Sequence, residues 1–262
     1  MRLYSISTCL IVGLLDTAPK LCGVASQGGL LYGESETHRV YVNGNNMSME
    51  DVFTIPLSMD APDIITLEFC ERGLFGNCRK FDYAVKQRQY KEQKVEVADK
   101  YVKYPPEVLA RMEKDKKKIG RARRTESDGT AFMDMRSPLP LDKFQVSGVY
   151  GSRRIFNGEP KNPHNGLDLA APRGTEFRAA AAGRVVLADD LYMTGNTIFI
   201  DHGNRIFSAY FHADELKVKV GDEVSADTII GKVGSTGRSS GPHLHLGIYH
   251  HNIALDPEFF IK

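Results

Sequence analysis

Short β-prone runs, separated by turn residues, recur on both sides of one break at Tyr104-Pro105-Pro106. Runs rich in β-branched and aromatic residues and bounded by Gly, Asn or Asp are typical of β-strands. The runs before the break lie at residues 29–33, 38–42, 51–55, 64–69 and 80–85, and those after it at 183–188, 195–201, 205–212, 219–224 and 228–233. We therefore expect a mainly β fold, with a small N-terminal β-sandwich and a C-terminal domain of antiparallel β-sheet.

A helix is expected directly after the break. Pro106 suits the first turn of a helix, and the residues up to Arg124 include many helix formers and few β-branched side chains. The second half of this stretch is strongly basic, with Lys114, Lys116, Lys117, Lys118, Arg121, Arg123 and Arg124. Such a run usually forms a solvated helix face, and attraction to an anionic polymer is the alternative. We predict an Ig-like β-sandwich at 27–97, a linker with the basic helix at 98–140 and a third domain at 141–262.

The charge balance excludes some classes of partner. The 262 residues carry 34 Lys and Arg against 33 Asp and Glu, which leaves a formal net charge of +1. No global field would therefore attract nucleic acid or an anionic membrane. The sequence has no apolar run of the roughly 18 residues that a spanning helix needs, so we expect no transmembrane segment in the mature chain.

The first 26 residues have the features of an export signal. Arg2 provides a positive charge, residues 8–15 are apolar, and the small residues of 23–26 would allow cleavage just before Gln27. A disordered start is the alternative. A lipid anchor on Cys22 is disfavoured, because Lys20 and Leu21 precede it where small residues would be needed.

Cysteine usage agrees with export. Cys9 and Cys22 fall in the predicted signal peptide, which leaves Cys70 and Cys78. The two glycines between Cys70 and Cys78 indicate a turn, so the pair is a candidate disulfide across a hairpin. Two reduced thiols are the alternative, and a metal site is disfavoured because no other ligand-rich spacing lies nearby.

Histidines concentrate in the C-terminal part of the chain. His243 and His245 lie two apart in a β-prone run, so their side chains would project from the same face of a strand. His164 and Asp168 lie four apart, with Gly166 between them to let the backbone bend. Two imidazoles and a carboxylate suit Zn²⁺, with a fourth position left for water. The alternative is a pair of polar residues on the solvent face of an ordinary strand.

A metal-bound water also needs a base, and the chain has no His-Glu-x-x-His segment to supply one. His212, at the end of a predicted strand, and the member of the 243/245 pair that does not bind metal are the candidates.

These residues together resemble one known family. His164-x-x-x-Asp168, then His212, then His243-x-His245 after a Ser-Ser-Gly-Pro sequence, resemble the LytM/lysostaphin-type zinc metallopeptidases, peptidase family M23. The resemblance covers about 146–260. It implies that His164, Asp168 and His245 bind one Zn²⁺ per chain. It also implies that His212 and His243 are the catalytic pair that activates water and stabilises the developing oxyanion.

The N-terminal half resembles exported members of the family that carry a β-sandwich and a helical linker. The segments that carry this looser resemblance are 27–30 and 105–111. The family implies hydrolysis of peptide cross-links or stem peptides of bacterial peptidoglycan, in the periplasm or cell envelope, with cell-wall regulatory proteins as further partners. The alternative within the family is a LytM-like non-catalytic activator of cell-wall amidases. All five site positions are filled here, which favours the enzyme.

Several other features have simpler interpretations. Residues 219–224 and 231–234 resemble half of a biotin or lipoyl carrier barrel, but the turn at 225–227 has no lysine to modify. The glycine-rich loop 231–237 lacks the rest of a phosphate-binding motif and is interpreted as a flexible loop beside the metal site. His202 is expected in a hairpin turn, and His250 and His251 are expected to be exposed in a final turn.

Overall fold

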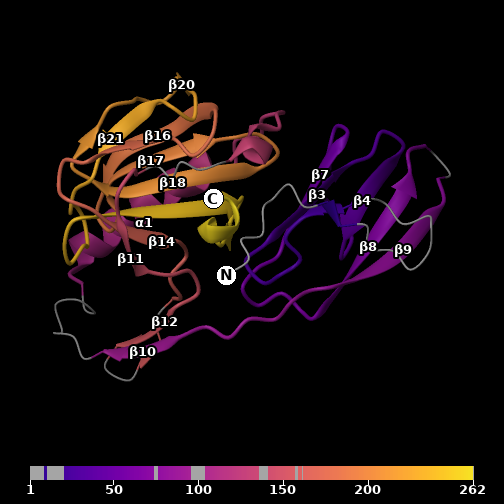
Figure 1. Ribbon diagram of the computed structural model, residues 1–262, viewed down its shortest axis with the longest axis horizontal. Helices are drawn as coiled ribbons and strands as arrows, with labels where there is room; N and C mark the ends of the chain where they lie inside the picture. The colour runs from indigo at the N-terminus through magenta and orange to yellow at the C-terminus, as the bar shows by residue number, and fades with distance from the viewer. Residues whose placement is uncertain are drawn as a thin grey trace. The chain divides into compact units, whose positions relative to one another are not determined.

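The structure is a computed structural model that describes residues 9–10, 21–73, 76–95, 104–135, 141–156, 159–160 and 162–261. The chain forms two compact units, residues 1–89 and 90–262 (Figure 1). The fold is mainly β, as predicted, and its strands pair antiparallel except for β10 (Glu92–Val95) with β12 (Arg153–Phe156). The single α-helix of the described residues is α1 (Pro106–Ala122). No described helix combines the length and the apolar character needed to cross a membrane.

Two sheets share one apolar core in the N-terminal unit. One sheet has the order β1 (Cys9–Leu10), β2 (Leu21–Gly23), β3 (Leu30–Glu34), β7 (Val52–Pro56), β6 (Ser48–Met49), and the other β5 (Asn45–Asn46), β4 (His38–Val42), β8 (Ile64–Glu71), β9 (Cys78–Ala84). Leu31 and Phe53 of the first sheet pack in the same cluster as Val40 and Leu67 of the second. Alternation along the strands produces this arrangement: in β8, Ile65, Leu67 and Phe69 are buried. The two sheets thus bury one common set of apolar side chains.

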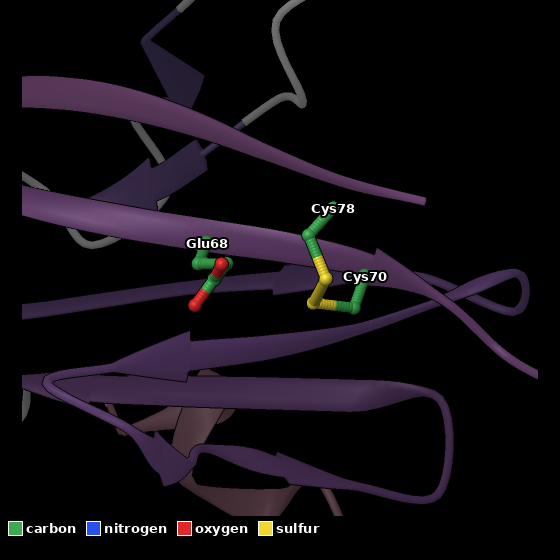
Figure 2. A group of neighbouring side chains, drawn as sticks. All are labelled: Glu68, Cys70 and Cys78. Atoms are coloured by element: carbon green, nitrogen blue, oxygen red, sulfur yellow. A yellow bond between two sulfur atoms is a disulfide. The ribbon is translucent and has the colours of Figure 1, made fainter. Parts of the chain in front are cut away.

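A disulfide joins the ends of the β8–β9 hairpin. Cys70 and Cys78 lie directly opposite each other in the register, and their sulfur atoms are bonded (Figure 2). Glu68, two residues earlier on β8, lies beside them and completes a group of three residue types that can bind metals. Because a thiolate, not a disulfide sulfur, is the metal ligand, this group is not a metal site while the bond is intact.

The first sheet begins before the predicted domain boundary at residue 27. β2 pairs with β3, and Leu21 is part of the apolar core. Cys22 is disulfide-bonded and lies opposite Cys9 in the β1–β2 register, whereas the sequence placed both in a signal peptide. Most of the predicted signal lies outside the described residues, and cleavage before Gln27 stays a prediction. Such cleavage would remove β2 from the sheet.

An eight-stranded sheet dominates the C-terminal unit. Its order is β11 (Gln145–Gly148), β14 (Leu167–Ala170), β22 (His243–His250), β18 (Ile206–Ala213), β17 (Gly195–Asp201), β16 (Gly183–Leu191), β20 (Glu223–Val224), with β23 (Ile253–Leu255) paired to β22 (Figure 1). Smaller sheets contain β15 (Glu176–Arg178), β21 (Ile229–Lys232) and β19 (Glu215–Leu216), and β10 (Glu92–Val95), β12 (Arg153–Phe156) and β13 (Glu159–Pro160). Two 3-10 turns, Ala131–Asp134 and Pro257–Phe259, complete the described elements.

Both faces of the large sheet are covered, which explains the nearly continuous apolar runs of its central strands. Every residue of β18 is buried. Its side chains alternate between two clusters: Tyr210 packs with Leu244 and Leu246 in one, and Phe207 and Phe211 belong to the other. This burial makes the centre of the sheet a rigid base for the side chains at the ends of its strands.

Helix α1 packs against β16 and belongs to the C-terminal unit rather than to a separate linker. Ala122 is part of an apolar cluster of the large sheet. Two basic side chains pair with β16: Arg111 Nη2 lies 2.8 Å from Asp190 Oδ2, and Lys118 Nζ lies 2.7 Å from Asp189 Oδ2. These pairs are exposed, so each contributes at most about 1 kcal/mol to stability. Of the predicted solvated face, Lys118 thus pairs with the sheet.

One predicted strand is mostly a turn. Of residues 219–224, only Glu223–Val224 form a strand. The preceding residues form a turn in which the backbone N–H of Lys219 donates to Asp222 Oδ2 at 3.0 Å. Asp side chains commonly accept such local backbone bonds, and these compete with strand formation.

A buried polar chain beneath the large sheet gives a prediction for stability. Tyr210 is fully buried, its hydroxyl accepts the backbone N–H of Ala180 at 2.7 Å, and it lies 2.9 Å from Ser208 Oγ. Tyr210→Phe leaves that buried amide without its acceptor, which costs about 1–3 kcal/mol. Calorimetry should show a lower unfolding temperature for the C-terminal unit.

The matched control is Tyr83→Phe in the N-terminal unit. The hydroxyl of Tyr83 is buried and has no hydrogen-bond partner among the described residues. Its removal should therefore change stability by less than about 0.5 kcal/mol, or increase it. Equal losses in the two variants would contradict the hydrogen-bond explanation.

Candidate active site

The pairing of β14 with β22 brings the first two site residues together. Asp168 lies opposite His245 in this antiparallel register, and Ala170 lies opposite His243. Leu167 and Leu169 alternate with Asp168 and are buried in the core. The carboxylate and the two imidazoles therefore share one face of the sheet, and the distance from His245 Nδ1 to Asp168 Oδ1 is 2.8 Å.

His164 completes a triangle of ligand atoms from the loop before β14. Its Nε2 lies 3.0 Å from Asp168 Oδ1 and 3.1 Å from His245 Nδ1. In a tetrahedral zinc site with bonds of about 2.0–2.1 Å, adjacent ligand atoms are roughly 3.3 Å apart. The triangle is thus close to the size that such an ion requires. Within the described residues, the two groups that could hold a metal are this one and the disulfide group of β8–β9.

The surroundings of the ligand residues set their orientation and their protonation. His164 Nδ1 lies 3.0 Å from the carbonyl oxygen of Val149, so Nδ1–H donates and Nε2 keeps its lone pair. Burial raises the pKa of Asp168, but the neighbouring imidazoles of His164 and His245 outweigh it and lower the pKa well below the usual range. Burial lowers the pKa of His245. These shifts favour an ionised Asp168 and a neutral His245, the forms in which the two side chains bind a metal.

A bulge in β18 turns the side chain of His212 toward the ligand triangle. Between Tyr210 and Ala213, β18 has one residue more than the facing part of β17, and His212 has a positive φ of 66°. That conformation is uncommon for a residue other than glycine and is often found at functional sites. Without the bulge, strand alternation would point His212 away from the face that carries His245. With it, the rings of His212 and His243 are 4.8 Å apart.

Backbone carbonyls hold both of these imidazoles by Nδ1. His212 Nδ1 lies 2.8 Å from the carbonyl oxygen of Thr236, and His243 Nδ1 lies 2.8 Å from that of Gly241. Each Nδ1–H donates, so in the neutral ring Nε2 is the proton acceptor. His243 Nε2 lies 3.8 Å from Asp168 Oδ1, beside the ligand triangle. Burial lowers the pKa of His212 to about 4, which keeps this ring neutral near pH 7.

The comparison with known families identifies this part of the chain. Residues 162–257 match the model of peptidase family M23. The matched range is an M23 peptidase domain. All the ligand and imidazole residues described above lie inside this matched range, which we call the M23 domain.

Named relatives are similar to less than half of the chain. The chain is 39% identical over 122 residues to peptidoglycan DD-endopeptidase ShyA of Vibrio cholerae, which covers 46% of this chain and 28% of that protein. It is 43% identical over 106 residues to DD-carboxypeptidase/endopeptidase Mpg of Neisseria meningitidis serogroup B, covering 40% of this chain and 24% of that protein. The chain thus spans less than a third of the length of these curated relatives.

One solved structure is similar over both units. It is a Pseudomonas aeruginosa protein described as an M23 peptidase, with a TM-score of 0.64 and 28% identity. The match covers 90% of this chain and 94% of that one. Because the match covers most of both chains, the N-terminal unit and the M23 domain also occur together in that protein.

Two glycines of the C-terminal unit, which sequence reasoning did not assign to the site, leave space for its side chains. A Cβ on Gly148 would lie 2.3 Å from Asp168 Oδ2, and a Cβ on Gly166 would lie 2.6 Å from His245 Nε2. We expected Gly166 to let the backbone bend, but the structure shows that the close approach of His245 requires it. The strand pairing of Gly148 with Asp168 could not be predicted from local sequence.

The loop 231–237 of the M23 domain is held in place rather than free. Thr236 Oγ1 donates to the carbonyl oxygen of Ala213 at 2.8 Å and accepts the backbone N–H of Asn196 at 2.9 Å. The prediction of a flexible loop overlooked these side-chain bonds. The loop does lie beside the site, because the carbonyl group of Thr236 holds His212.

The remaining histidines of the M23 domain lie away from the ligand triangle. The prediction that His250 is exposed in a final turn is wrong: it is the last residue of β22 and is 4% exposed. The chain turns one residue later, at His251, which is partly exposed. His202 lies in the turn between β17 and β18, as expected, but it is buried and bonded to the carbonyl oxygen of Ala182 and to Ser208 Oγ.

Proposed function

We propose that this protein is a zinc-dependent endopeptidase that hydrolyses peptide cross-links or stem peptides of bacterial peptidoglycan. One observation carries the proposal: three ligand atoms of His164, Asp168 and His245 lie within 3.1 Å of one another, with the imidazoles of His212 and His243 beside them. The similarity to proteins named as peptidoglycan DD-endopeptidases supports the choice of substrate.

His164, Asp168 and His245 would hold the Zn²⁺, which polarises the scissile carbonyl and lowers the pKa of a water molecule to near 7. The catalytic pair, His212 and His243, would transfer the protons. With Nδ1–H donated to a carbonyl oxygen, Nε2 of His212 or His243 accepts a proton from the attacking water. The protonated Nε2 then donates to the oxyanion or to the leaving amine. This sequence needs both rings to be neutral at the start, as the lowered pKa of His212 favours.

We also propose that the protein works in the periplasm or cell envelope, where the substrate lies. The disulfide between Cys70 and Cys78 supports an oxidising compartment, in which such bonds persist. Cell-wall regulatory proteins are the further partners that this location would offer.

Mass spectrometry of muropeptides tests the function. Purified peptidoglycan should release new peptide fragments when digested with the zinc-loaded protein, and their masses identify the bond that is cut. The protein treated with a metal chelator and the His164→Ala protein should release no peptide fragments. Zinc binding without any release would instead favour a non-catalytic activator of cell-wall amidases, which an amidase stimulation assay would then detect.

A further inference from the structure

Helix α1 buries a carboxylate on the face where apolar side chains are expected. The two buried residues of the helix are Asp115 and Ala122. They lie seven positions apart, so they share one face of the helix, and the helix packs against β16. Ala122 joins an apolar cluster of the large sheet, but burial of a carboxylate is costly unless its oxygen atoms accept hydrogen bonds. The donor that Asp115 meets is therefore the key to its role.

That donor is a backbone amide of the loop 192–194, which connects β16 to β17. The N–H of Tyr192 donates to Asp115 Oδ2 at 2.8 Å. The same oxygen lies 3.9 Å from Nε of the exposed Arg111, so the amide is the closer of the two partners. The hydrogen bond joins positions 77 residues apart and fixes the loop 192–194 to the helix.

The loop 192–194 in turn holds the backbone of His212. The N–H of His212 donates to the carbonyl oxygen of Thr194 at 2.8 Å. This bond lies at the bulge of β18, where His212 has its positive φ of 66°. A strained backbone conformation persists only where the surrounding contacts impose it. The loop thus supplies one of the contacts that turn the ring of His212 toward His243.

The same loop also supports the second contact of His212. Nδ1–H of His212 donates to the carbonyl oxygen of Thr236. The loop that carries Thr236 is bonded to the loop 192–194, because the backbone N–H of Arg238 donates to the carbonyl oxygen of Met193 at 2.9 Å. A displacement of the loop 192–194 would therefore affect both the backbone and the ring of His212.

We propose that Asp115 is a positioning residue of the peptidase. By accepting the N–H of Tyr192 it fixes the loop 192–194, and through this loop it keeps the imidazole of His212 beside that of His243. The inference rests on the proposed function, because that function assigns His212 to catalysis. It makes helix α1 part of the support of the active site rather than only a linker.

Two substitutions of similar shape test Asp115 in the full-length, zinc-loaded protein. Asp115→Asn keeps an oxygen atom that can accept the N–H of Tyr192, whereas Asp115→Leu has the same branched shape without an acceptor. Asp115→Leu should lower kcat for soluble muropeptide dimers about 10–100-fold, because a misplacement of about 1 Å can cost about 100-fold in rate. KM should change less than about twofold, since only the catalytic step loses its geometry. Asp115→Asn should keep at least about half of kcat.

The leucine variant separates positioning from a purely structural role. An apolar side chain at a buried position favours packing of the helix on the sheet, so a purely structural role would let Asp115→Leu keep its kcat. Lys118→Gln is the matched control, because Lys118 pairs with Asp189 of β16 rather than with the loop 192–194. Full kcat in Asp115→Leu, or an equal loss in Asp115→Asn or Lys118→Gln, would overturn the positioning role and leave the peptidase function intact.

Hydrogen–deuterium exchange tests the positioning without turnover. Amides of Tyr192 and His212 should exchange at least about tenfold faster in Asp115→Leu than in the unmodified protein, while those of β22 and all amides of Lys118→Gln keep their rates. If the unmodified protein hydrolyses no peptidoglycan, the peptidase function fails, and selectively faster exchange at His212 still supports its positioning by Asp115. Unchanged exchange at His212, or equally faster exchange throughout the C-terminal unit, would overturn the proposal.

Discussion

The His245→Ala protein is expected to lose its zinc, whereas the His243→Ala protein is expected to keep zinc and lose turnover. His245 Nδ1 belongs to the ligand triangle, at 2.8 Å from Asp168 Oδ1. His243 Nε2 lies 3.8 Å from the same oxygen, and its Nδ1 is bonded to a backbone carbonyl. Loss of a proton-transfer group typically lowers the rate about 10²–10⁴-fold, so His243→Ala should lower kcat by that factor.

Metal content by elemental analysis and turnover of peptidoglycan measure the two effects separately. His38→Ala is the control, because His38 lies on β4 in the N-terminal unit, and it should change neither quantity. If His243→Ala removed the zinc and His245→Ala did not, the two roles would be reversed.

Asp168→Asn should weaken zinc binding by at least about 100-fold while the domain stays folded. The substitution keeps the size of the side chain but replaces the charged oxygen ligand with a neutral amide. An ionised carboxylate is the better ligand for Zn²⁺, and even changes around the ligands of a metal site commonly cost about 10–100-fold in affinity. Competition with a chelator measures the affinity, and circular dichroism confirms the fold.

Asp142→Asn is the matched control for this experiment. Asp142 is an exposed carboxylate of the same domain and pairs with Arg178 at 2.9 Å, away from the ligand triangle. Its substitution should leave the zinc affinity within about twofold of the original, because an exposed pair contributes little. Unchanged affinity in Asp168→Asn would remove Asp168 from the ligand set.

Local patterns were sufficient for much of the fold. The alternation in β8 and the continuous apolar runs of β18 and β22 predict strands, because side chains alternate across a strand whatever its partner. The missed strands are short: β14 has four residues and directly follows the loop that carries His164. Short strands contain too few residues for alternation to stand out from the loops around them.

The sequence by itself determined which residue types are present for chemistry. His164, Asp168, His212 and the His243/His245 pair could be selected from spacing and resemblance, because metal binding and proton transfer require these side chains. The structure brings all five together, and their separate roles stay predictions that the substitutions above test. The spacing of His243 and His245 placed both on one face before any partner strand was known.

Only the tertiary structure decided how these side chains meet. The register that sets Asp168 opposite His245, the bulge that turns His212 toward His243, and the carbonyl group of Thr236 that fixes its ring all depend on pairing between distant segments. Helix α1 gives a second example: its basic residues indicated a solvated face, yet Lys118 meets Asp189 across 71 positions of sequence. Such contacts depend on how whole strands and helices pack, which no local pattern encodes.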